Sequence, residues 1–227
     1  MSNLEVAPTD EKLASCSHEW VHKSYQCTSY AENEKVYDEW AKVYDSTMDP
    51  DHYQAPIGLV NHLKKNSLVD VEASVVDIGC GTGLLGKYMV ELGGFKNLDG
   101  IDQSQGMLDE AGKKGIYKQL VKGTLGLDLP LPDNTYDAAV SSGVFTPGHA
   151  PAKSLYDVAK LIKPGGIVCY TLKYDLYENS DYPAVHKDME EKGIWECAGH
   201  SEKYDALPGD KGAGNCPLVA FTWRVLK

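Results

Sequence analysis

The amino-acid sequence predicts an α/β fold, in which a mostly parallel sheet of seven strands carries helices on both faces and ends in an antiparallel hairpin strand. Three observations predict it. From residue 75 onward, short β-branched runs alternate with helical patterns, which is typical of βαβ units. A glycine-rich turn follows the first of these runs. Two strand-like runs joined by a flexible loop close the chain, and such a hairpin reverses the direction of the last strand.

The expected elements follow in chain order. The seven strands are expected at residues 75–79, 97–102, 117–121, 136–142, 167–173, 195–204 and 217–226. Helices are expected between them at residues 82–92, 104–115, 150–162 and 183–192, where apolar residues recur at helical spacing between Gly, Pro and Ser signals. Two more helical patterns, at residues 34–44 and 56–66, precede the first strand.

Length and composition indicate one domain. With 227 residues, the chain can form one full α/β domain, which we place at residues 34–227 with lid helices at 34–70. Residues 1–33 are polar, and we expect them to be disordered or part of a lid. No apolar run reaches the roughly 20 residues of a membrane span, and no secretory leader opens the chain. We therefore expect a cytoplasmic protein without a membrane partner, either a monomer or a homodimer.

Charge and cysteine content restrict the partners. A formal charge of −11 disfavours DNA and RNA, because nucleic-acid affinity depends on Lys and Arg neutralising phosphates. An acidic surface tolerates small neutral or cationic substrates instead. The histidines show no metal-ligand spacing, and the cysteines contain no C-x-x-C pair, so we expect no metal site and reduced thiols. The six cysteines are Cys16, Cys27, Cys80, Cys169, Cys197 and Cys216.

The glycine-rich turn, VVDIGCGTGLLG, has two interpretations. Read from Gly81 it is the G-x-G-x-x-G of a dinucleotide-binding dehydrogenase; read from Asp77 it is the first motif of a methyltransferase that uses S-adenosylmethionine (SAM). Both place a nucleotide-bearing cofactor where a strand ends and a helix begins. Both also use Asp102, 19 residues beyond Gly83, to accept hydrogen bonds from ribose hydroxyls.

Two details favour the methyltransferase interpretation. The Asp77 carboxylate would orient a cationic amino group, whereas it would repel a pyrophosphate. The hairpin ending also differs from a dinucleotide fold, which would continue into a second βαβαβ half. A rival signal is Tyr156 and Lys160, spaced like the catalytic pair of short-chain dehydrogenases. That family's glycine spacing is absent here, so we interpret this pair as structural.

Four motifs resemble, in order and spacing, those of the class I SAM-dependent methyltransferases, whose fold is Rossmann-like. They are VVDIGCGTG at residues 75–83, GIDQSQGML at 100–108, LPDNTYDAAVSSGV at 131–144 and LIKPGG at 161–166. YDEWAKVYD at 37–45 resembles the lid helix of small-molecule members. More narrowly, residues 34–196 are similar to the methyltransferase-like proteins named for the Williams-Beuren syndrome chromosomal region. The resemblance implies SAM as cofactor and S-adenosylhomocysteine (SAH) as product.

The resemblance also implies roles for individual residues. Asp77, Gly79, Cys80, Gly81 and Gly83 would surround the methionine moiety, Asp102 would hold the ribose, and Gln103 and Met107 would flank the adenine. Family members often carry an Asp after the third strand, where this chain has Gly-Thr-Leu, so Thr124 and Leu125 are assigned to the adenine. Ser141, Ser142 and Gly143 would close the fourth strand beside the sulfonium methyl.

Four further residues are candidates for the reacting centre. Tyr37, Trp40 and Tyr44 share one helix face, where aromatic rings can contact a sulfonium and exclude water. Trp40 is assigned to the cofactor, and the two tyrosines to the reaction. His149 follows a core strand, and a base with an ordinary pKa near 6.5 could deprotonate the nucleophile.

The sequence thus predicts methyl transfer to N, O or S of a small molecule by in-line displacement. Two alternatives stay open: an NAD(P)-dependent oxidoreductase, and a SAM-binding regulatory module without turnover.

Overall fold

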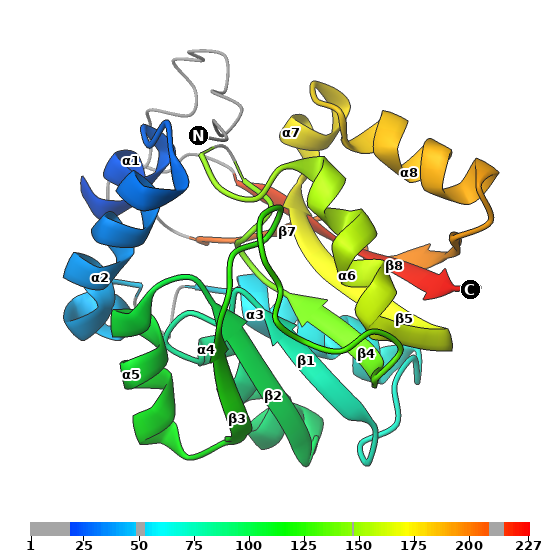
Figure 1. Ribbon diagram of the computed structural model, residues 1–227, viewed down its shortest axis with the longest axis horizontal. Coiled ribbons are helices and arrows are strands. Elements are labelled where there is room, and N and C mark those ends of the chain that lie inside the picture. The colour runs from blue at the N-terminus through cyan, green and yellow to red at the C-terminus, as the bar shows by residue number, and fades with distance from the viewer. Residues whose placement is uncertain (1–18, 49–52, 147, 209–215) are drawn as a thin grey trace.

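The eight strands of this computed structural model form one twisted sheet (Figure 1). The structure describes residues 19–48, 53–146, 148–208 and 216–227. The strands are β1 Ser74–Ile78, β2 Asn97–Asp102, β3 Tyr117–Lys122, β4 Tyr136–Ser141, β5 Ile162–Lys173, β6 Trp195–His200, β7 Tyr204–Asp205 and β8 Pro217–Val225. Their order is β3-β2-β1-β4-β5-β8-β6, with β7 paired to β8. Strands β1 to β5 are parallel, and β8 is antiparallel to β5 and β6.

The predicted α/β class, mostly parallel sheet and reversed last strand are confirmed. The structure has eight strands, one more than the sequence predicts. The predicted run at residues 195–204 divides into β6 and the two-residue β7, because the register with β8 shifts between Cys197 and Gly199 and the chain then leaves the ladder. The hairpin also places β8 between β5 and β6, so β8 lies inside the sheet.

Helices cover both faces of the sheet. The helices are α1 Glu19–Tyr25, α2 Tyr30–Thr47, α3 Ala55–Lys65, α4 Leu84–Tyr88, α5 Gln105–Lys114, α6 Leu155–Leu161, α7 Tyr174–Glu178 and α8 Tyr182–Glu191. The predicted helix at 82–92 begins later, at Leu84, because Gly83 has a left-handed backbone; the turn Met89–Gly93 that follows α4 is π-helical. Among the described residues, no helix is both long and apolar enough to cross a bilayer.

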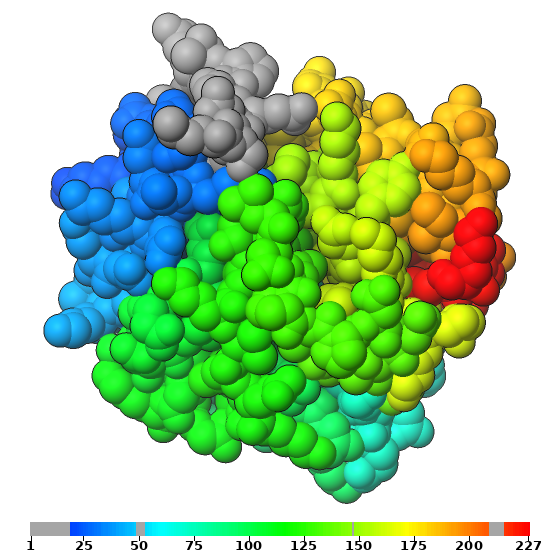
Figure 2. Space-filling view, in the orientation of Figure 1, coloured from blue at the N-terminus to red at the C-terminus, as the bar shows by residue number. Residues whose placement is uncertain are grey.

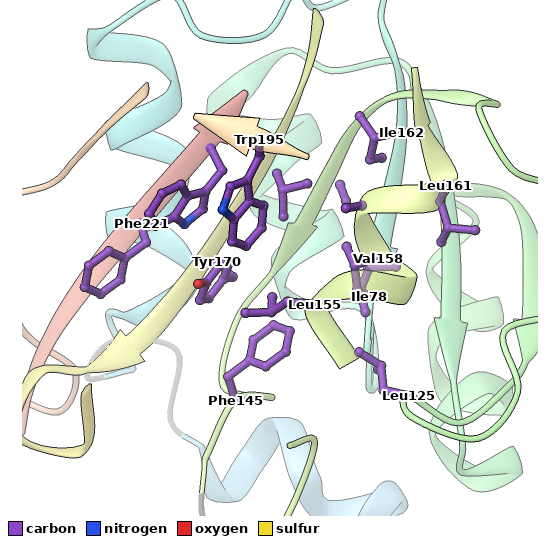
Figure 3. Packing of buried hydrophobic residues seen from close by; sticks show 14 of the residues in the cluster. Ile78, Leu125, Phe145, Leu155, Val158, Leu161, Ile162, Tyr170, Trp195 and Phe221 are labelled. Carbon is purple, nitrogen blue, oxygen red and sulfur yellow. The ribbon is translucent and has the colours of Figure 1, made fainter. Parts of the chain in front are cut away.

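Strand alternation divides the core into two layers. Val76 and Ile78 of β1 face the layer that contains α6 and α8, whereas Val75 faces α3 and α4. Figure 3 shows the first layer, where Phe145, Tyr170 and Trp195 pack with the leucines of α6. Because both faces of the parallel strands are covered, the carboxyl-end edge of the sheet is where a ligand can approach.

Helix α2 begins earlier than predicted and includes part of the segment expected to be disordered. Ser29 caps it by accepting a hydrogen bond from the Glu32 amide, and the Glu32 carboxylate accepts from the Thr28 amide and hydroxyl. The boundary placed between residues 33 and 34 therefore falls inside a helix, and residues 19–33 are largely helical. Residues 1–18 of that segment lie outside the described part of the chain.

Candidate functional site

The glycine-rich turn forms the floor of the site. Gly79, Gly81 and Gly83 all have positive φ, at 67°, 55° and 88°, a backbone region that side chains disfavour. The Gly79 and Cys80 amides both donate to the Ile101 carbonyl, at 2.8 and 3.0 Å, which holds the turn against β2. A methyl group added at Gly81 would point into open space, with no described atom within 4 Å. The backbone at Gly81 is thus open to a ligand.

Asp102 ends β2 beside this turn and carries the carboxylate of the site. Its Oδ2 accepts from the Gly81 amide at 2.9 Å, and its Oδ1 accepts from the Ser104 amide at 2.9 Å. Burial raises the pKa of Asp102 to about 6, although the Ser104 and Gly81 amides oppose this shift. The two amides fix the orientation of the carboxylate and leave its remaining lone pairs for a ligand.

A cavity with about 660 Å³ of empty volume, part of it open to solvent, lies above Asp102 and the turn. Ten of the residues predicted from the sequence line it: Tyr37, Tyr44, Gly79, Gly81, Asp102, Gln103, Thr124, Leu125, Ser142 and His149. They come from α2, the glycine turn, the end of β2 and the loops after β3 and β4. The structure therefore brings together residues that are up to 112 positions apart in sequence, as for Tyr37 and His149.

Helix α2 covers the cavity with one face. Residues 33, 37, 40 and 44 recur at helical spacing and point inward. Trp40 is buried between Trp20 and Tyr37, with ring centroids 6.0 and 5.7 Å away, and its indole N–H donates to Thr47 Oγ1 at 2.7 Å. Asn33 donates to the Gly148 carbonyl at 2.9 Å and accepts from the Gln103 amide. This face therefore reaches the loops on both sides of the cavity.

The neighbouring face of α2 holds the helix in place through charged residues. Asp38 Oδ1 accepts from Ser104 Oγ at 2.6 Å and from the Gly106 amide at 2.8 Å, at the start of α5. Asp45 pairs with Lys114 at 2.6 Å and accepts from the Thr82 hydroxyl in the glycine turn. Glu34 pairs with Lys122 of β3 at 2.6 Å. Figure 2 shows the blue surface of α1 and α2 in contact with the green surface that includes α5.

His149 and Tyr37 meet at the cavity wall. The Tyr37 hydroxyl lies 2.7 Å from His149 Nε2, and Thr146 Oγ1 lies 3.0 Å from His149 Nδ1. Burial raises the pKa of Tyr37 above its usual range, and that of Tyr44 rises for the same reason. The phenols of Tyr37 and Tyr44 are therefore neutral at ordinary pH. In the pair of Tyr37 and His149, the imidazole is thus the group that can take up a proton.

A second cavity, with about 760 Å³ of empty volume, adjoins the first. Tyr37, Tyr44 and Gly143 line both, so they form the wall between them. Trp40, predicted as a cofactor contact, lines this second cavity and is absent from the lining of the first. The Trp40 ring is stacked in the core between two other aromatic rings, which explains why it contacts the second cavity and not the first.

Asp77, which is predicted to contact the cofactor, is absent from the linings of both cavities. It is 1% exposed and lies on the α3 and α4 face of β1, where its Oδ2 accepts from the Tyr117 hydroxyl at 2.7 Å. Its Oδ1 is buried and has no hydrogen-bond partner among the described residues. Burial raises the pKa of Asp77 to about 7. Asp77 therefore supports the glycine turn from the side of the sheet that α3 and α4 cover.

Four other predicted contacts are also outside the lining of the first cavity. The buried Cys80 side chain points toward Gly100 of β2, and Ser141 donates to the Ile78 carbonyl at 2.8 Å. Gly83 caps α4 and lies against the Tyr117 ring. Met107 packs in the core with Trp40. Cys80 and Ser141 are next to residues that line the cavity, but the backbone directs their side chains away from it. Gly83 and Met107 have no lining residue beside them in the sequence, because they lie at the start of α4 and in the core under α2.

Gly143, predicted with Ser142 at the end of the fourth strand, also lines the cavity, and five further lining residues were not predicted: Tyr30, Asn33, Gly123, Val144 and Ala150. Tyr30 and Asn33 belong to the first turn of α2, which the Ser29-x-x-Glu32 capping signal could have located. Gly143 has a φ of 76°, and a methyl group there would lie 2.8 Å from the Tyr53 hydroxyl. Its amide donates to Thr171 Oγ1 at 3.1 Å, which ties the wall to β5.

The described residues contain no cluster of three or more His, Cys, Asp or Glu side chains that could hold a metal ion. Cys27, Cys80, Cys169, Cys197 and Cys216 form no disulfide with one another, while Cys16 is outside the described residues.

Comparison with known proteins identifies the family. Residues 76–170 match the family model described as a methyltransferase domain. Methyltransferase-like protein 27 from Homo sapiens is 32% identical over 181 residues, covering 78% of this chain and 73% of that protein. The 18S rRNA (guanine-N(7))-methyltransferase from Bos taurus is 36% identical over 94 residues, covering 38% of this chain and 33% of that protein.

Solved structures agree with the fold. A TehB-like SAM-dependent methyltransferase from Corynebacterium glutamicum has a TM-score of 0.56 at 18% identity, covering 87% of this chain and all of that one. The glycine turn is thus the methyltransferase motif, and the dinucleotide interpretation is not adopted. The chain belongs to the SAM-dependent methyltransferases, in the group that includes methyltransferase-like protein 27.

Proposed function

We propose that this methyltransferase transfers the methyl group of SAM to N, O or S of a small molecule. The observation that carries the proposal is the pair of adjoining cavities, which share a wall of Tyr37, Tyr44 and Gly143. One cavity suits the cofactor and the other the acceptor, so the transferred group would pass at this wall. Helix α2 contributes lining residues to both cavities, and its position there favours a small acceptor and would limit the access of water.

The residues of the first cavity fit SAM. When bound, SAM supplies an activated methyl group on a sulfonium. The open face at Gly81 admits a ligand against the backbone, and the oriented Asp102 carboxylate suits ribose hydroxyls. Gln103, Thr124 and Leu125 line the part of the cavity next to Asp102 and form the proposed adenine site. The Tyr37 and Tyr44 rings provide electron-rich faces for a cation.

His149 is the proposed base, to be used where the acceptor arrives protonated. Nε2 is hydrogen-bonded to Tyr37, whose phenol stays protonated, and Nδ1 to Thr146. These two contacts orient the ring at the cavity wall. The other contributions of the chain are to position the acceptor and to exclude water, because the sulfonium needs no further activation.

A second candidate, methylation of RNA, is favoured by the match to the 18S rRNA (guanine-N(7))-methyltransferase. The net charge of −11 opposes it, since phosphate contacts supply most RNA affinity. The match covers 33% of that relative. We therefore place it second.

Incubation with methyl-labelled SAM tests both candidates. The purified chain would be given either a metabolite extract filtered to small molecules or total RNA, with Asp102→Asn as the paired control. We expect label in the small-molecule fraction that the Asp102→Asn variant reduces strongly. Label in RNA alone would support the second candidate, and SAH binding without label in either fraction would support a regulatory module without turnover.

A further inference from the structure

The second cavity offers hydrogen-bond donors and one positive charge. Tyr37, Tyr44 and Tyr53 belong to its lining, and burial raises the pKa of all three, in the case of Tyr53 to about 12. The phenols of Tyr44 and Tyr53 therefore keep protons that they can donate, whereas the Tyr37 hydroxyl is hydrogen-bonded to His149 Nε2. Among the described residues that line it, Lys173 is the only one with a charged side chain, and none has a carboxylate.

Lys173 lies where a ligand can reach it. It ends β5, at the carboxyl edge of the sheet where ligands of this fold class bind, and it is half-buried. Its Nζ lies 5.7 Å from the centroid of the Tyr25 ring, and within the described ranges it forms no ion pair. Lys114 and Lys122, near the first cavity, each pair with a carboxylate of α2. Lys173 has no such protein counter-charge among these residues.

The rest of the cavity suits an apolar body. Its wall includes the rings of Trp40 and Tyr53 and the side chains of Met48, Leu207 and Leu218. Burying apolar surface of a ligand against this wall favours binding. The lining therefore combines an apolar wall with a single cation and several donors.

We propose that this second cavity binds a small apolar or aromatic molecule carrying one carboxylate, and that Lys173 recognises the carboxylate. This rests on the proposed function, because it names the class of acceptor. A carboxylate accepts from Lys173 and the phenols, whereas an ammonium would meet a like charge and no carboxylate. The charge of the whole chain matters less, since exposed charges are screened beyond about 8 Å at physiological salt. The acceptor class thus differs from the neutral or cationic one expected from composition.

Three probes with one phenol ring test the proposal: 3-(4-hydroxyphenyl)propionate, neutral 4-propylphenol and cationic 3-(4-hydroxyphenyl)propylamine. Each is titrated calorimetrically into the full chain saturated with SAH. We expect the propionate to bind about tenfold or more tighter than the other two. Lys173→Met should remove this preference and Lys173→Arg should keep it. Lys65→Met is the matched control, because Lys65 is an exposed lysine at the end of α3.

The outcomes separate this proposal from the proposed function. Equal affinity for all three probes, tighter binding of the amine, or a preference for the propionate that survives in Lys173→Met would overturn the carboxylate assignment. So would absence of propionate binding to the SAH-saturated chain. Titration of SAH alone, made first, tests the proposed function by itself, because Lys173 is not in the lining of the first cavity. Lys173→Met should therefore bind SAH as the unsubstituted chain does, which also shows that the variant is folded.

Discussion

At the scale of single residues, one buried and one half-buried carboxylate set the electrostatics beneath the site. Asp77 and Asp102 lie at the ends of neighbouring strands, and burial raises the pKa of each, to about 7 and about 6. The Asp102 charge contributes to the raised pKa of Asp77. Such groups favour the protonated form in the folded state, in contrast to an exposed carboxylate.

The Asp77→Asn variant should gain stability relative to the unsubstituted chain as the pH rises from 6 to 8. A raised carboxyl pKa contributes stability below the unfolded pKa, and this contribution is lost as the pH rises through the folded pKa near 7. The expected relative gain is about 1 kcal/mol, or about 2–4 °C in Tm. Burial lowers the pKa of His62 and His186, but both cancel in this comparison. Thermal unfolding at the two pH values measures the gain. The exposed Asp109→Asn should show no such trend.

His149→Gln should lower kcat by about 10²- to 10⁴-fold for an acceptor that must lose a proton. The rising limb of the pH profile of kcat should disappear with it. Tyr37→Phe keeps the imidazole and should retain the limb, because Tyr37 acts on the ring through a hydrogen bond. Steady-state kinetics across pH, together with SAH affinity, give the measurement. A pH profile unchanged in His149→Gln would show that another group takes the proton.

At the scale of the element, α2 explains why the lid could be predicted only in part. The 37, 40, 44 spacing predicted a helix with an aromatic face, which the structure has. Its first turn was missed because Tyr30 and Asn33 precede the apolar pattern, and the Ser29 and Glu32 cap alone marks that start. The partners of Asp38 and Asp45 come from other elements, and no local pattern identifies such contacts.

The strands show a similar limit. The motif located β1 and its turn, yet Asp77 lies on the face packed against α3 and α4, whereas the neighbouring turn lines the cavity. Alternation along a strand is visible in the sequence, but which face opens to a ligand depends on the helices that cover it. Burial on both faces removes the polar alternation that would distinguish them.

Asp45→Ala should speed dissociation of SAH by about two- to tenfold. The substitution removes the Lys114 pair and the Thr82 hydrogen bond that hold α2 over the glycine turn, and partly exposed contacts of this kind contribute about 0.2–1 kcal/mol each. Stopped-flow tryptophan fluorescence gives the rate. Asp157→Ala is a matched control, since Asp157 is as exposed as Asp45, at 42% and 43%, and also pairs with a lysine, on α6. Equal rates of SAH dissociation from Asp45→Ala and Asp157→Ala would show that the Asp45 contacts do not hold α2 over the ligand.

At the scale of the whole molecule, the sequence was sufficient for the class of fold and not for its strand order. Alternating strand and helix patterns predict a parallel sheet, and the late hairpin predicts one reversed strand. That β8 inserts between β5 and β6 was not predictable, because the pairing partner of a strand is chosen by packing across the sheet. The cavities are also a property of the whole, since their linings combine α1, α2, the glycine turn and loops from both halves of the chain.

Ligand binding should therefore stabilise the fold as a unit. Because SAH would contact α2, the glycine turn and the loop after β4 together, its binding free energy opposes unfolding of all three. At 100 times its Kd, a ligand adds about 2.7 kcal/mol, which corresponds to about 5–10 °C in Tm for a domain of this size. Differential scanning fluorimetry over a series of SAH concentrations measures the shift. The Asp102→Asn variant should need at least about ten times more SAH for the same shift in Tm, because it loses charge-assisted hydrogen bonds. Equal curves for both chains would place the ligand away from Asp102.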